Sequence, residues 1–340
     1  MTKQRPTIAD VAREAGVSKG LVSFALNDRP GVSAASRARI LKVASELGWR
    51  PSLRARSLST DRAFALGLVI ARDPEIISAD PFFPAFIAGI EKALAPAGQV
   101  LVLSMVPDEA AEAASYRQLA ESGRVDGVII TDLRREDERF ALIAELGLAA
   151  VTLGRPDIDT LVPSISLDDA SGIHAAVNHL VELGHRRIAH VAGPYRMLHA
   201  RRRSASFSDA LAHHGLPDDL VVETDFTASD GARATRELLG LSDRPTAIVY
   251  ANDPMAIAGM GVAQRRGLTV PRDLSITGFD GSEVGAFIHP ALTTVTTNAG
   301  EWGQRAAELL LRVIAREDVA DIDLAPASLL LRESTAPPQA

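Results

Sequence analysis

Three short helical patterns follow one another in the first sixty residues, with almost no spare residues between them. Residues 8–15, 21–26 and 40–47 each place apolar side chains three and four positions apart, which is the spacing of one buried helix face. Gly16 and Gly48 follow the first and third patterns, at the point where glycine commonly ends a helix. The polar residues that can cap the three helix starts are Thr7, Ser18 and Ser33. Two helices joined by a tight turn, with a third packed beside them, are typical of a helix-turn-helix DNA-binding domain.

Charge is divided unevenly along the chain. The first sixty residues contain eleven Lys and Arg against four Asp and Glu, a net charge of +7, whereas the whole chain carries −7 and the remainder therefore −14. A basic segment attracts the phosphates of DNA, and the acidic remainder does not. The charge distribution therefore places nucleic-acid binding at the N-terminal end alone.

The same stretch resembles the DNA-binding domain of the lactose-repressor (LacI/GalR) family of bacterial transcription regulators. The resemblance lies in TIADVAREAGVS at 7–18, the pair Val22 and Ser23, Asn27, GVS at 31–33, LGW at 47–49 and RPSLRARSL at 50–58. It runs without gaps over about fifty residues and continues through the body of the chain. It implies a cytoplasmic repressor of carbohydrate-utilisation genes that binds a near-palindromic operator as a homodimer and needs no cofactor.

The resemblance also implies which residues contact DNA. Residues 1–50 would form the helix-turn-helix domain, and residues 51–62 a hinge helix and linker. In the hinge helix, Leu58 of each subunit would enter the minor groove as an apolar wedge that bends the duplex. The alternative for this segment is a plain interdomain linker. The residues expected at the DNA are Thr7, Ser18, Lys19, Gly20, Ser23, Phe24, Asn27, Arg54, Ala55 and Leu58.

Two positions of the expected recognition helix depart from the family pattern, in which polar side chains are frequent. Gly20 has no side chain with which to contact a base edge, and it weakens its helix by roughly 1 kcal/mol relative to alanine. Phe24 either contacts the methyl group of a thymine or turns inward. The preferred operator sequence therefore cannot be transferred from a relative.

Length and composition limit the remaining possibilities. At 340 residues the chain is too long for one ordinary core, and 46 % hydrophobic with 4 % aromatic residues is typical of an α/β protein with two or three domains. The absence of cysteine excludes disulfides, thiolate metal sites and cysteine nucleophiles. No apolar run suits a signal peptide, and no stretch of about 18 apolar residues could span a membrane. We therefore expect a cytoplasmic protein.

From residue 63 onward, strand-like apolar runs alternate with amphipathic helices, which predicts parallel sheets covered by helices on both faces. Nine strands are better divided between two sheets than placed in one. They are predicted at 65–71, 99–104, 126–131, 149–153, 164–167, 187–192, 247–252, 274–279 and 292–297. The resemblance implies an effector-binding and dimerisation domain at 63–340. This domain would have two periplasmic-binding-protein-like subdomains, about 63–162 with 298–321 and about 163–297 with 322–334.

Ligands of such folds bind in the crevice at the carboxyl ends of the strands, so polar and aromatic residues that follow strands are candidates for effector binding. Arginine and aspartate can form paired hydrogen bonds to neighbouring hydroxyls, and an aromatic ring can cover the apolar face of a pyranose. These residue types predict a sugar effector, although a purine fits similar chemistry. The expected contacts are Asp73, Phe82, Phe83, Arg155, Arg201, Phe226, Asn252, Asp253 and Asp280.

The resemblance singles out three of these contacts. It aligns Arg201 with the effector-binding arginine of the family, Asp253 with its main polar contact and Phe226 with an aromatic against the ligand. Each has a structural alternative. Asp253 could cap a helix, the run 201–203 could be a solvated helix face, and Phe226 or Phe82 could belong to a core.

The sequence shows no pattern typical of a catalytic or metal site. His174 and His179, like His185 and His190, are five residues apart, whereas two zinc ligands on one helix face need four. No grouping of Ser, His and Asp has supporting context, so an enzyme is the weakest interpretation. A solute-binding protein of a transporter would share the body but have no use for the N-terminal segment. Only eight residues follow Arg332, so we expect a dimer without an added tetramer-forming helix.

Overall fold

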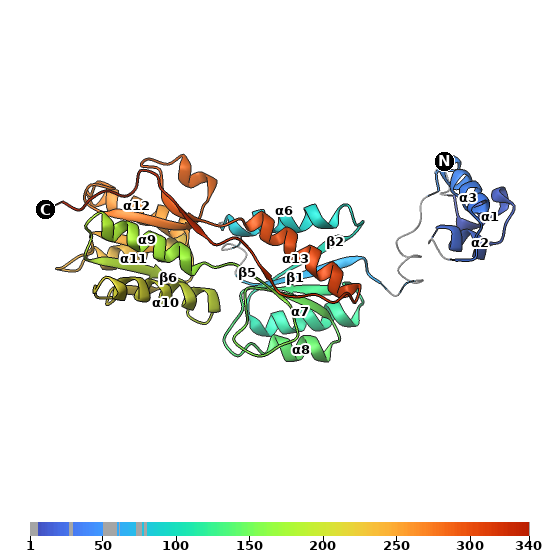
Figure 1. Cartoon of the computed structure of the whole chain (residues 1–340), viewed down its shortest axis with the longest axis horizontal. Helices are drawn as coiled ribbons and strands as arrows, with labels where there is room; N and C mark the ends of the chain where they lie inside the picture. Colours follow the sequence, from blue (N-terminus) through green and yellow to red (C-terminus); the bar gives the residue numbers. More distant parts are fainter. Residues whose placement is uncertain are drawn as a thin grey trace. The chain divides into compact units, whose positions relative to one another are not determined.

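The computed structural model describes residues 6–26, 30–49, 60, 62–72, 77 and 80–339. The chain divides into two compact units, Met1–Ala63 and Phe64–Ala340. The described part of the first unit contains helices, and the second unit contains two lobes, each built on a largely parallel sheet (Figure 1). The predicted fold class is therefore confirmed.

The first unit is a small helical domain made of α1 (Ile8–Ala15), α2 (Lys19–Leu26) and α3 (Ala34–Glu46). At the start of α1, Thr7 Oγ1 accepts a hydrogen bond from the Asp10 backbone N–H at 3.4 Å, and the Thr7 backbone N–H donates to the Asp10 carboxylate at 2.9 Å. This capping box satisfies two backbone donors that a helix start otherwise leaves unpaired. The residues buried between the helices are Val11, Ala12, Ala15, Val22, Ala25, Ile40 and Ala44.

Lobe one of the second unit has a parallel six-stranded sheet in the order β11-β5-β4-β3-β1-β2. Its strands are β1 (Ala65–Ala71), β2 (Val100–Val106), β3 (Gly127–Ile130), β4 (Ala149–Leu153), β5 (Ser164–Ser166) and β11 (Ile322–Asp323). Its helices are α6 (Phe82–Leu94), α7 (Glu109–Glu121), α8 (Arg139–Glu145) and α13 (Ala299–Ile314). In Figure 1, α6 and α13 lie side by side on one face of this sheet, with α7 and α8 on the other.

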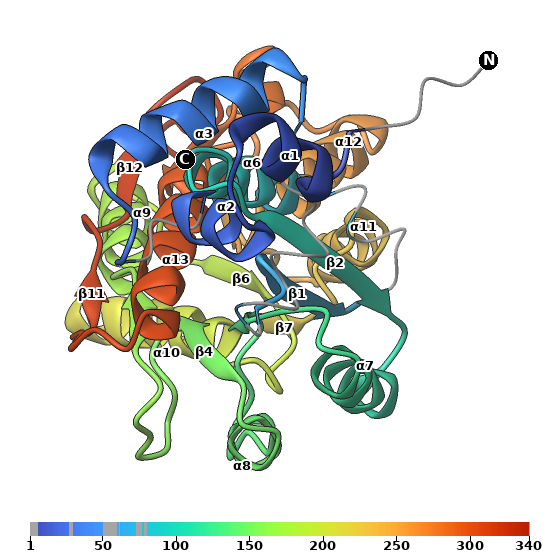
Figure 2. The same cartoon turned by 90° about the vertical axis from the view of Figure 1, so that its right-hand side faces the viewer.

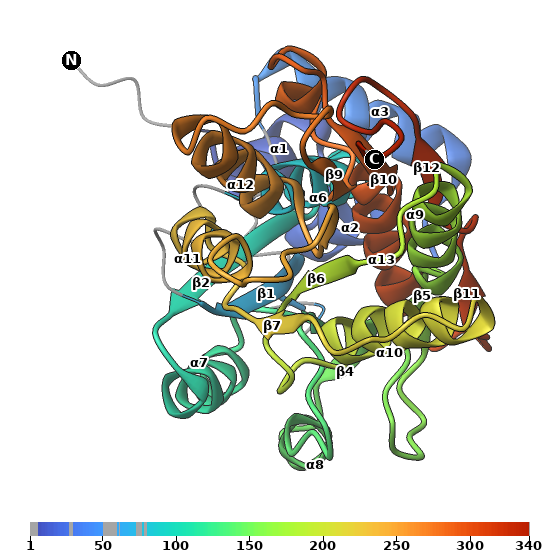
Figure 3. The same cartoon turned by 90° about the vertical axis from the view of Figure 1, so that its left-hand side faces the viewer.

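Lobe two has a second six-stranded sheet in the order β12-β10-β9-β8-β6-β7, parallel except for β12, which runs antiparallel to β10. Its strands are β6 (Ile188–Ala192), β7 (Val221–Glu223), β8 (Ala247–Tyr250), β9 (Ser275–Asp280), β10 (Thr293–Thr296) and β12 (Ser328–Leu330). Its helices are α9 (Ala170–Glu182), α10 (Leu198–His213), α11 (Ala228–Leu238), α12 (Asp253–Arg265) and the 3₁₀ helix η1 (Glu283–Ala286). Figure 3 shows α9 and α10 on one side of this sheet and α11 and α12 on the other.

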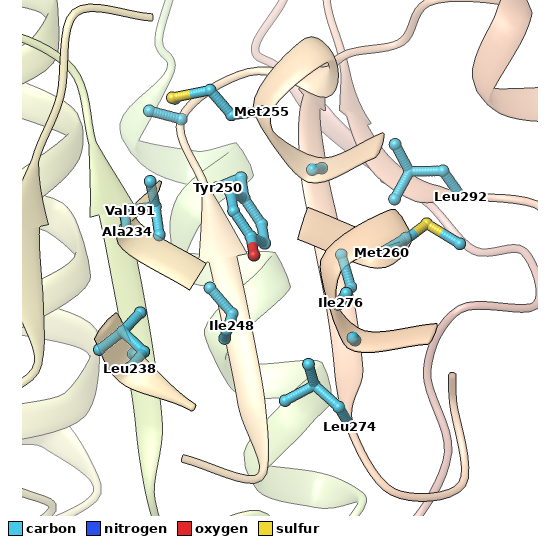
Figure 4. Close-up of a cluster of buried hydrophobic side chains, with 14 of the residues drawn as sticks. Val191, Ala234, Leu238, Ile248, Tyr250, Met255, Met260, Leu274, Ile276 and Leu292 are labelled. Carbon is cyan, nitrogen blue, oxygen red and sulfur yellow. The ribbon is translucent and has the colours of Figure 1, made fainter. Parts of the chain in front are cut away.

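The face of lobe two under α11 and α12 is packed with apolar side chains (Figure 4). Tyr250 is fully buried there, and its hydroxyl lies 2.7 Å from the hydroxyl of Thr235. A Cβ on Gly259 of α12 would lie 2.1 Å from the Tyr250 hydroxyl oxygen, so only glycine lets the helix approach the sheet this closely. Gly259 is therefore required by the packing of α12 against the sheet.

Each of the nine predicted strands is present, with ends shifted by up to a few residues. The sequence did not predict β7, β11 and β12, because two or three residues are too short to show an alternating apolar pattern. Within the described residues, none of the helices combines the length and apolar character needed to cross a bilayer.

Candidate DNA-contacting face and effector cavity

Helix α2 presents an outward face at the positions expected to contact DNA. Lys19 and Gly20 are exposed, and Phe24 is 42 % exposed, whereas Val22 and Ala25 of the same helix are buried in the core of the first unit. Of the two alternatives for Phe24, the structure therefore supports the outward one. The helix periodicity separates this face from the buried one.

The other expected DNA contacts lie around the same helix or outside the described residues. Ser18 accepts a hydrogen bond from the Leu21 backbone N–H at 3.1 Å, which caps the start of α2. Ser23 is half-buried, and Thr7 is exposed at the start of α1. The expected contacts outside the described residues are Asn27, Arg54, Ala55 and Leu58.

A cavity lies between the two lobes of the second unit. Its walls come from loops and helix starts that follow β1, β3, β4, β5, β6, β8 and β9, so it sits at the carboxyl ends of the strands, as predicted. Four of the expected effector contacts line it: Phe82, Phe226, Asn252 and Asp280. The other charged or ionisable residues of the lining are Arg72, Asp80, Asp132, Asp169, His199, Arg202 and Arg203.

Arg72, which follows β1, is the fixed positive group on the lobe-one side of the cavity. Its Nε and Nη2 donate hydrogen bonds to the two carboxylate oxygens of Asp132 at 2.6 and 2.5 Å, and Asp80 lies 3.7 Å from Nη1. Burial alone would raise the pKa of Asp132, but the charge and hydrogen bonds of Arg72 outweigh it and lower that pKa to about 2. The pair therefore stays ionised and holds its geometry.

Arg203, on α10, is the corresponding group of lobe two. Its Nε donates to Asp169 at 3.2 Å, its Nη1 donates to the Ala251 carbonyl at 2.9 Å, and its guanidinium carbon lies 3.6 Å from the ring centroid of Phe279. These contacts fix the guanidinium in place. A molecule in the cavity would thus meet one oriented arginine from each lobe.

Asp280 and His199 line the cavity without a hydrogen bond inside the described part of the chain. Burial raises the pKa of Asp280 to about 8, so its carboxyl is largely protonated at neutral pH. Burial, reinforced by Arg203, lowers the pKa of His199 to about 3, so the ring is neutral. The His199 ring stacks on Phe226, with centroids 5.5 Å apart and planes 10° apart. Both groups are available to hydrogen-bond a ligand.

Backbone strain is also concentrated at this cavity. Asp280 has φ 101° and Phe226 has φ 71°, values in the left-handed region that residues with a Cβ adopt at a cost. Both residues line the cavity. Residues held in such conformations are frequent at ligand sites, which supports a binding function for this part of the cleft.

The lobes touch each other beside the cavity. The Leu198 backbone N–H donates to the Leu133 carbonyl at 2.8 Å, and Arg134 pairs with Met197 in a short antiparallel bridge. Arg72 Nη2 also donates to the sulfur of Met197 at 3.6 Å. The cleft of this structure is therefore in a closed arrangement.

Comparison with known proteins identifies the family. Residues 7–52 match the model for bacterial regulatory proteins of the lacI family, and residues 177–335 match a periplasmic binding protein-like domain. An uncharacterised HTH-type transcriptional regulator in the aml 5′ region of Streptomyces limosus is 36 % identical over 343 residues, covering 97 % of this chain and 95 % of that protein. The chain belongs to the lacI family.

Solved lacI-family structures match it along nearly its whole length. A CelR–cellobiose complex is 32 % identical with a TM-score of 0.75, covering 97 % of this chain and 100 % of that one. The lac repressor dimer bound to operator and the anti-inducer ONPF is 29 % identical with a TM-score of 0.84, covering 98 % and 100 %. This lacI-family protein is therefore a DNA-binding transcriptional regulator, and its family membership excludes the enzyme interpretation.

Asp253 does not have the role expected of it, whereas Asn252 lines the cavity and also caps α12. Asn252, not Asp253, caps α12: its side chain accepts a hydrogen bond from the Met255 backbone N–H at 3.0 Å. Asp253 is fully buried below the cavity, where it accepts hydrogen bonds from the Ser282 backbone N–H and the Thr294 hydroxyl, both at 2.6 Å. Direct effector contact and helix capping are therefore both wrong for Asp253, which instead anchors the loop that follows Asp280.

The structure also places Arg201 outside the cavity, so the expected contact between Arg201 and the effector is wrong. Its side chain is exposed and lies with Tyr195 and Ser204 on a separate surface, whereas Arg202 and Arg203 line the cavity. Successive helix residues point about 100° apart, so a shift of one or two positions along α10 exchanges an outward arginine for an inward one. The solvated-face alternative holds for Arg201 alone.

Three further expected contacts do not line the cavity in the structure. Arg155 is exposed and donates from Nη2 to both carboxylate oxygens of Asp323 at 2.8 and 2.9 Å; only its backbone carbonyl takes part near the cleft, accepting a hydrogen bond from Arg202. Phe83 is buried, with the Arg72 guanidinium 5.2 Å from its ring centroid, so it supports the cavity from behind. Asp73 lies outside the described residues.

The expected contacts omitted four residues that now define the cavity: Arg72, Asp132, His199 and Arg203. Arg72 follows β1 directly, where the strand-end rule selects it together with Asp73, and Asp132 lies two residues after β3, where the same rule could have found it. His199 and Arg203 lie four residues apart and therefore share one face of α10. This four-residue spacing could have indicated that Arg203, of the three consecutive arginines, faces the cavity together with His199.

Proposed function

We propose that this regulator represses carbohydrate-utilisation genes, and that a sugar bound between the lobes controls its affinity for operator DNA. The observation that carries the proposal is the combination, in one cavity, of oriented arginines with the stacked rings of His199 and Phe226. Such groups bind vicinal hydroxyls and the apolar face of a sugar ring. The relative CelR has been solved with cellobiose, which supports this effector class.

The cavity gives a physical route from ligand to DNA. Lobe one contributes Arg72 and Asp132, and lobe two contributes Arg203 and Asp280, so a ligand that contacts all four favours the closed arrangement over an open one. Differential affinity for two arrangements is what a ligand needs to shift their populations. We infer that the closed and open arrangements present the DNA-binding units of a dimer differently to the operator.

We also infer that the regulator binds a near-palindromic operator as a homodimer. A single eight-residue recognition helix covers a short half-site, which two-fold symmetric binding doubles. The lac repressor relative is a dimer on its operator. β2 (Figure 2) is an edge strand of the lobe-one sheet. It exposes Val100, Leu103 and Met105, of which Leu103 and Met105 share one face, and such exposed apolar side chains suit contact with a second copy.

A purine is the second candidate effector. The stacked rings of His199 and Phe226 suit a planar base, and the protonated carboxyl of Asp280 can donate to a ring nitrogen while the neutral imidazole accepts or donates. A thermal-shift screen of the full chain against sugars and nucleobases separates the two classes. A ligand at 100 times its dissociation constant adds about 2.7 kcal/mol to the free energy of unfolding.

The DNA-binding part of the proposal is tested with fluorescence anisotropy. The full chain is titrated into labelled duplex from its own promoter region at moderate salt, with scrambled duplex as competitor, before and after adding the sugar found in the screen. We expect sequence-selective binding that changes with the sugar. Equal affinity for native and scrambled duplex would contradict operator recognition, and affinity that no sugar or nucleobase alters would contradict effector control.

A further inference from the structure

We propose that Phe24 recognises the 5-methyl group of a thymine in each operator half-site, and that Gly20 leaves the space this methyl group occupies. This inference rests on the proposed function, because it requires sequence-selective binding to duplex DNA. It adds the base that the recognition helix selects and the two residues that select it.

The Phe24 side chain lies on the side of α2 that faces away from the core. Val22 and Ala25 are buried against α1 and α3, while Phe24 is 42 % exposed on the same outward face as Lys19 and Gly20. A single exposed apolar side chain is ordinary on a protein surface. Here it stands on the helix face opposite the core of a basic domain, which is where such a domain contacts a base edge.

Gly20 supplies the second, independent observation. It lies four residues before Phe24, and residues four apart lie next to each other on one helix face. A Cβ built on Gly20 would have Ser18 Oγ, 3.9 Å away, as its nearest neighbour among the described residues, and the glycine does not have a positive φ. Neither packing nor backbone conformation in the described part of the chain therefore requires glycine, although glycine destabilises a helix relative to alanine.

The chemistry of the two residues selects one base. Phenylalanine has neither a hydrogen-bond donor nor an acceptor, so it distinguishes base pairs only by apolar contact. In the major groove, the thymine methyl is the apolar group that differs between base edges. Because residues four apart are neighbours on one helix face, we infer that a methyl group in the space beside Gly20 contacts the Phe24 ring. Any side chain at position 20 would occupy that space. Lys19 remains available for a phosphate or a guanine.

The first test removes single methyl groups from the DNA and needs no change in the protein. Selection from random duplexes with the full chain first gives its preferred operator. Each thymine is then replaced by deoxyuridine, which lacks only the methyl group, and affinity is measured by fluorescence anisotropy. We expect one position per half-site at which the replacement weakens binding about fourfold, and about fifteenfold when both half-sites are changed.

Three variants connect the effect to the residues. Phe24→Ala should bind the thymine and deoxyuridine operators equally. Gly20→Ala should keep or raise the melting temperature yet lose most of the preference for thymine, which a purely structural glycine would not do. Leu41→Ala removes another exposed apolar side chain, on α3, and should keep the full preference.

Two results would overturn the inference while leaving operator recognition intact. One is a wild-type protein that binds its selected operator equally well after every thymine is replaced. The other is a Phe24→Ala variant that keeps the wild-type ratio of affinities for the two operators. If selection returns no preferred sequence, the proposed function itself fails, and this inference fails with it.

Discussion

Two clusters of buried charge in the second unit are alike in composition but differ in how completely they are hydrogen-bonded. In the α7–α8 cluster, made of Glu112, Arg134, Asp137 and Arg139, Arg139 donates to Asp137 at 2.9 and 2.6 Å, to Glu112 at 2.7 Å and to the Asp132 carbonyl at 3.0 Å. In the effector cavity, the Asp280 carboxyl has no hydrogen-bond partner within the described part of the chain, although the backbone of Asp280 belongs to strand β9. The first cluster stabilises lobe one, and the second has polar groups left for a ligand.

The comparison predicts its largest effect at Arg139. Arg139→Met leaves Asp137 buried without its counter-charge and Glu112 paired with Arg134 alone, so it should lower the free energy of unfolding by about 3–5 kcal/mol in urea denaturation. The matched control is Arg135→Met, because Arg135 is exposed and, among the described residues, forms an ion pair with exposed Glu136 alone. The control should change stability by less than about 0.5 kcal/mol. Similar losses in the two variants would remove the distinction between the clusters.

The second prediction concerns neighbouring arginines of α10. Arg203→Ala should weaken effector binding by about tenfold or more, since a hydrogen bond to a charged group contributes about 1.5–3 kcal/mol. Arg201→Ala should leave the affinity within about twofold, because that side chain faces away from the cavity. Isothermal titration calorimetry with the sugar from the screen measures both. A larger loss of effector affinity in Arg201→Ala than in Arg203→Ala would instead support Arg201 as the effector contact, as the sequence predicts.

The third prediction separates binding from stability at Asp280. Asp280→Asn should abolish most of the effector-induced thermal shift, yet lower the free energy of unfolding by no more than about 1 kcal/mol, because the carboxyl has no hydrogen-bond partner among the described residues to lose. The result should thus be the opposite of that at Arg139. A large loss of stability with normal effector binding would place Asp280 among the structural charges.

The most gradual expected effect is a pH dependence of stability. The pKa of Asp280 is raised to about 8 in the folded protein from an ordinary value of 3.8, so folding takes up a proton between those values. The contribution of Asp280 to the free energy of unfolding is complete below about pH 4 and is lost as the pH rises toward 8. The slope is at most about 1.4 kcal/mol per pH unit.

Urea denaturation of the wild type and Asp280→Asn at pH 5, 6, 7 and 8 isolates this contribution. We expect the wild type to lose stability relative to the variant across the series. His199, whose pKa is lowered to about 3, acts in the other direction: its effect appears as the pH falls below about 6.5, where only the unfolded chain takes up the proton. A constant difference between the two proteins would contradict the raised pKa of Asp280.

The sequence predicted local structure far better than it predicted the cavity wall. The helix starts at Thr7 and Ser33 and the nine predicted strands follow from patterns of neighbouring residues, and the structure contains them. The family resemblance and the helix-turn-helix interpretation depend on the same short-range spacing. Short strands such as β7 carry no such pattern, because their pairing is set by the neighbouring strand.

The cavity residues were only partly predictable, because side-chain direction depends on tertiary packing. Asn252 and Asp253 are adjacent, and the strand-end rule selects both, but only the contacts with Thr294 and Ser282 show that Asp253 is buried. The choice between Arg201 and Arg203 likewise depends on which face of α10 packs against the sheet. Arg155 was placed by its position after a strand, yet Asp323, far away in the sequence, draws its side chain outward.

The central claim is that the cavity between the lobes controls how tightly the protein holds its operator. The most direct measurement is fluorescence anisotropy of the selected operator with wild type and Asp280→Asn, each with and without the sugar from the screen. The account predicts equal operator affinity for the two proteins without sugar, and a sugar-dependent change in the wild type alone. An Asp280→Asn variant that responds to the sugar as the wild type does would contradict it.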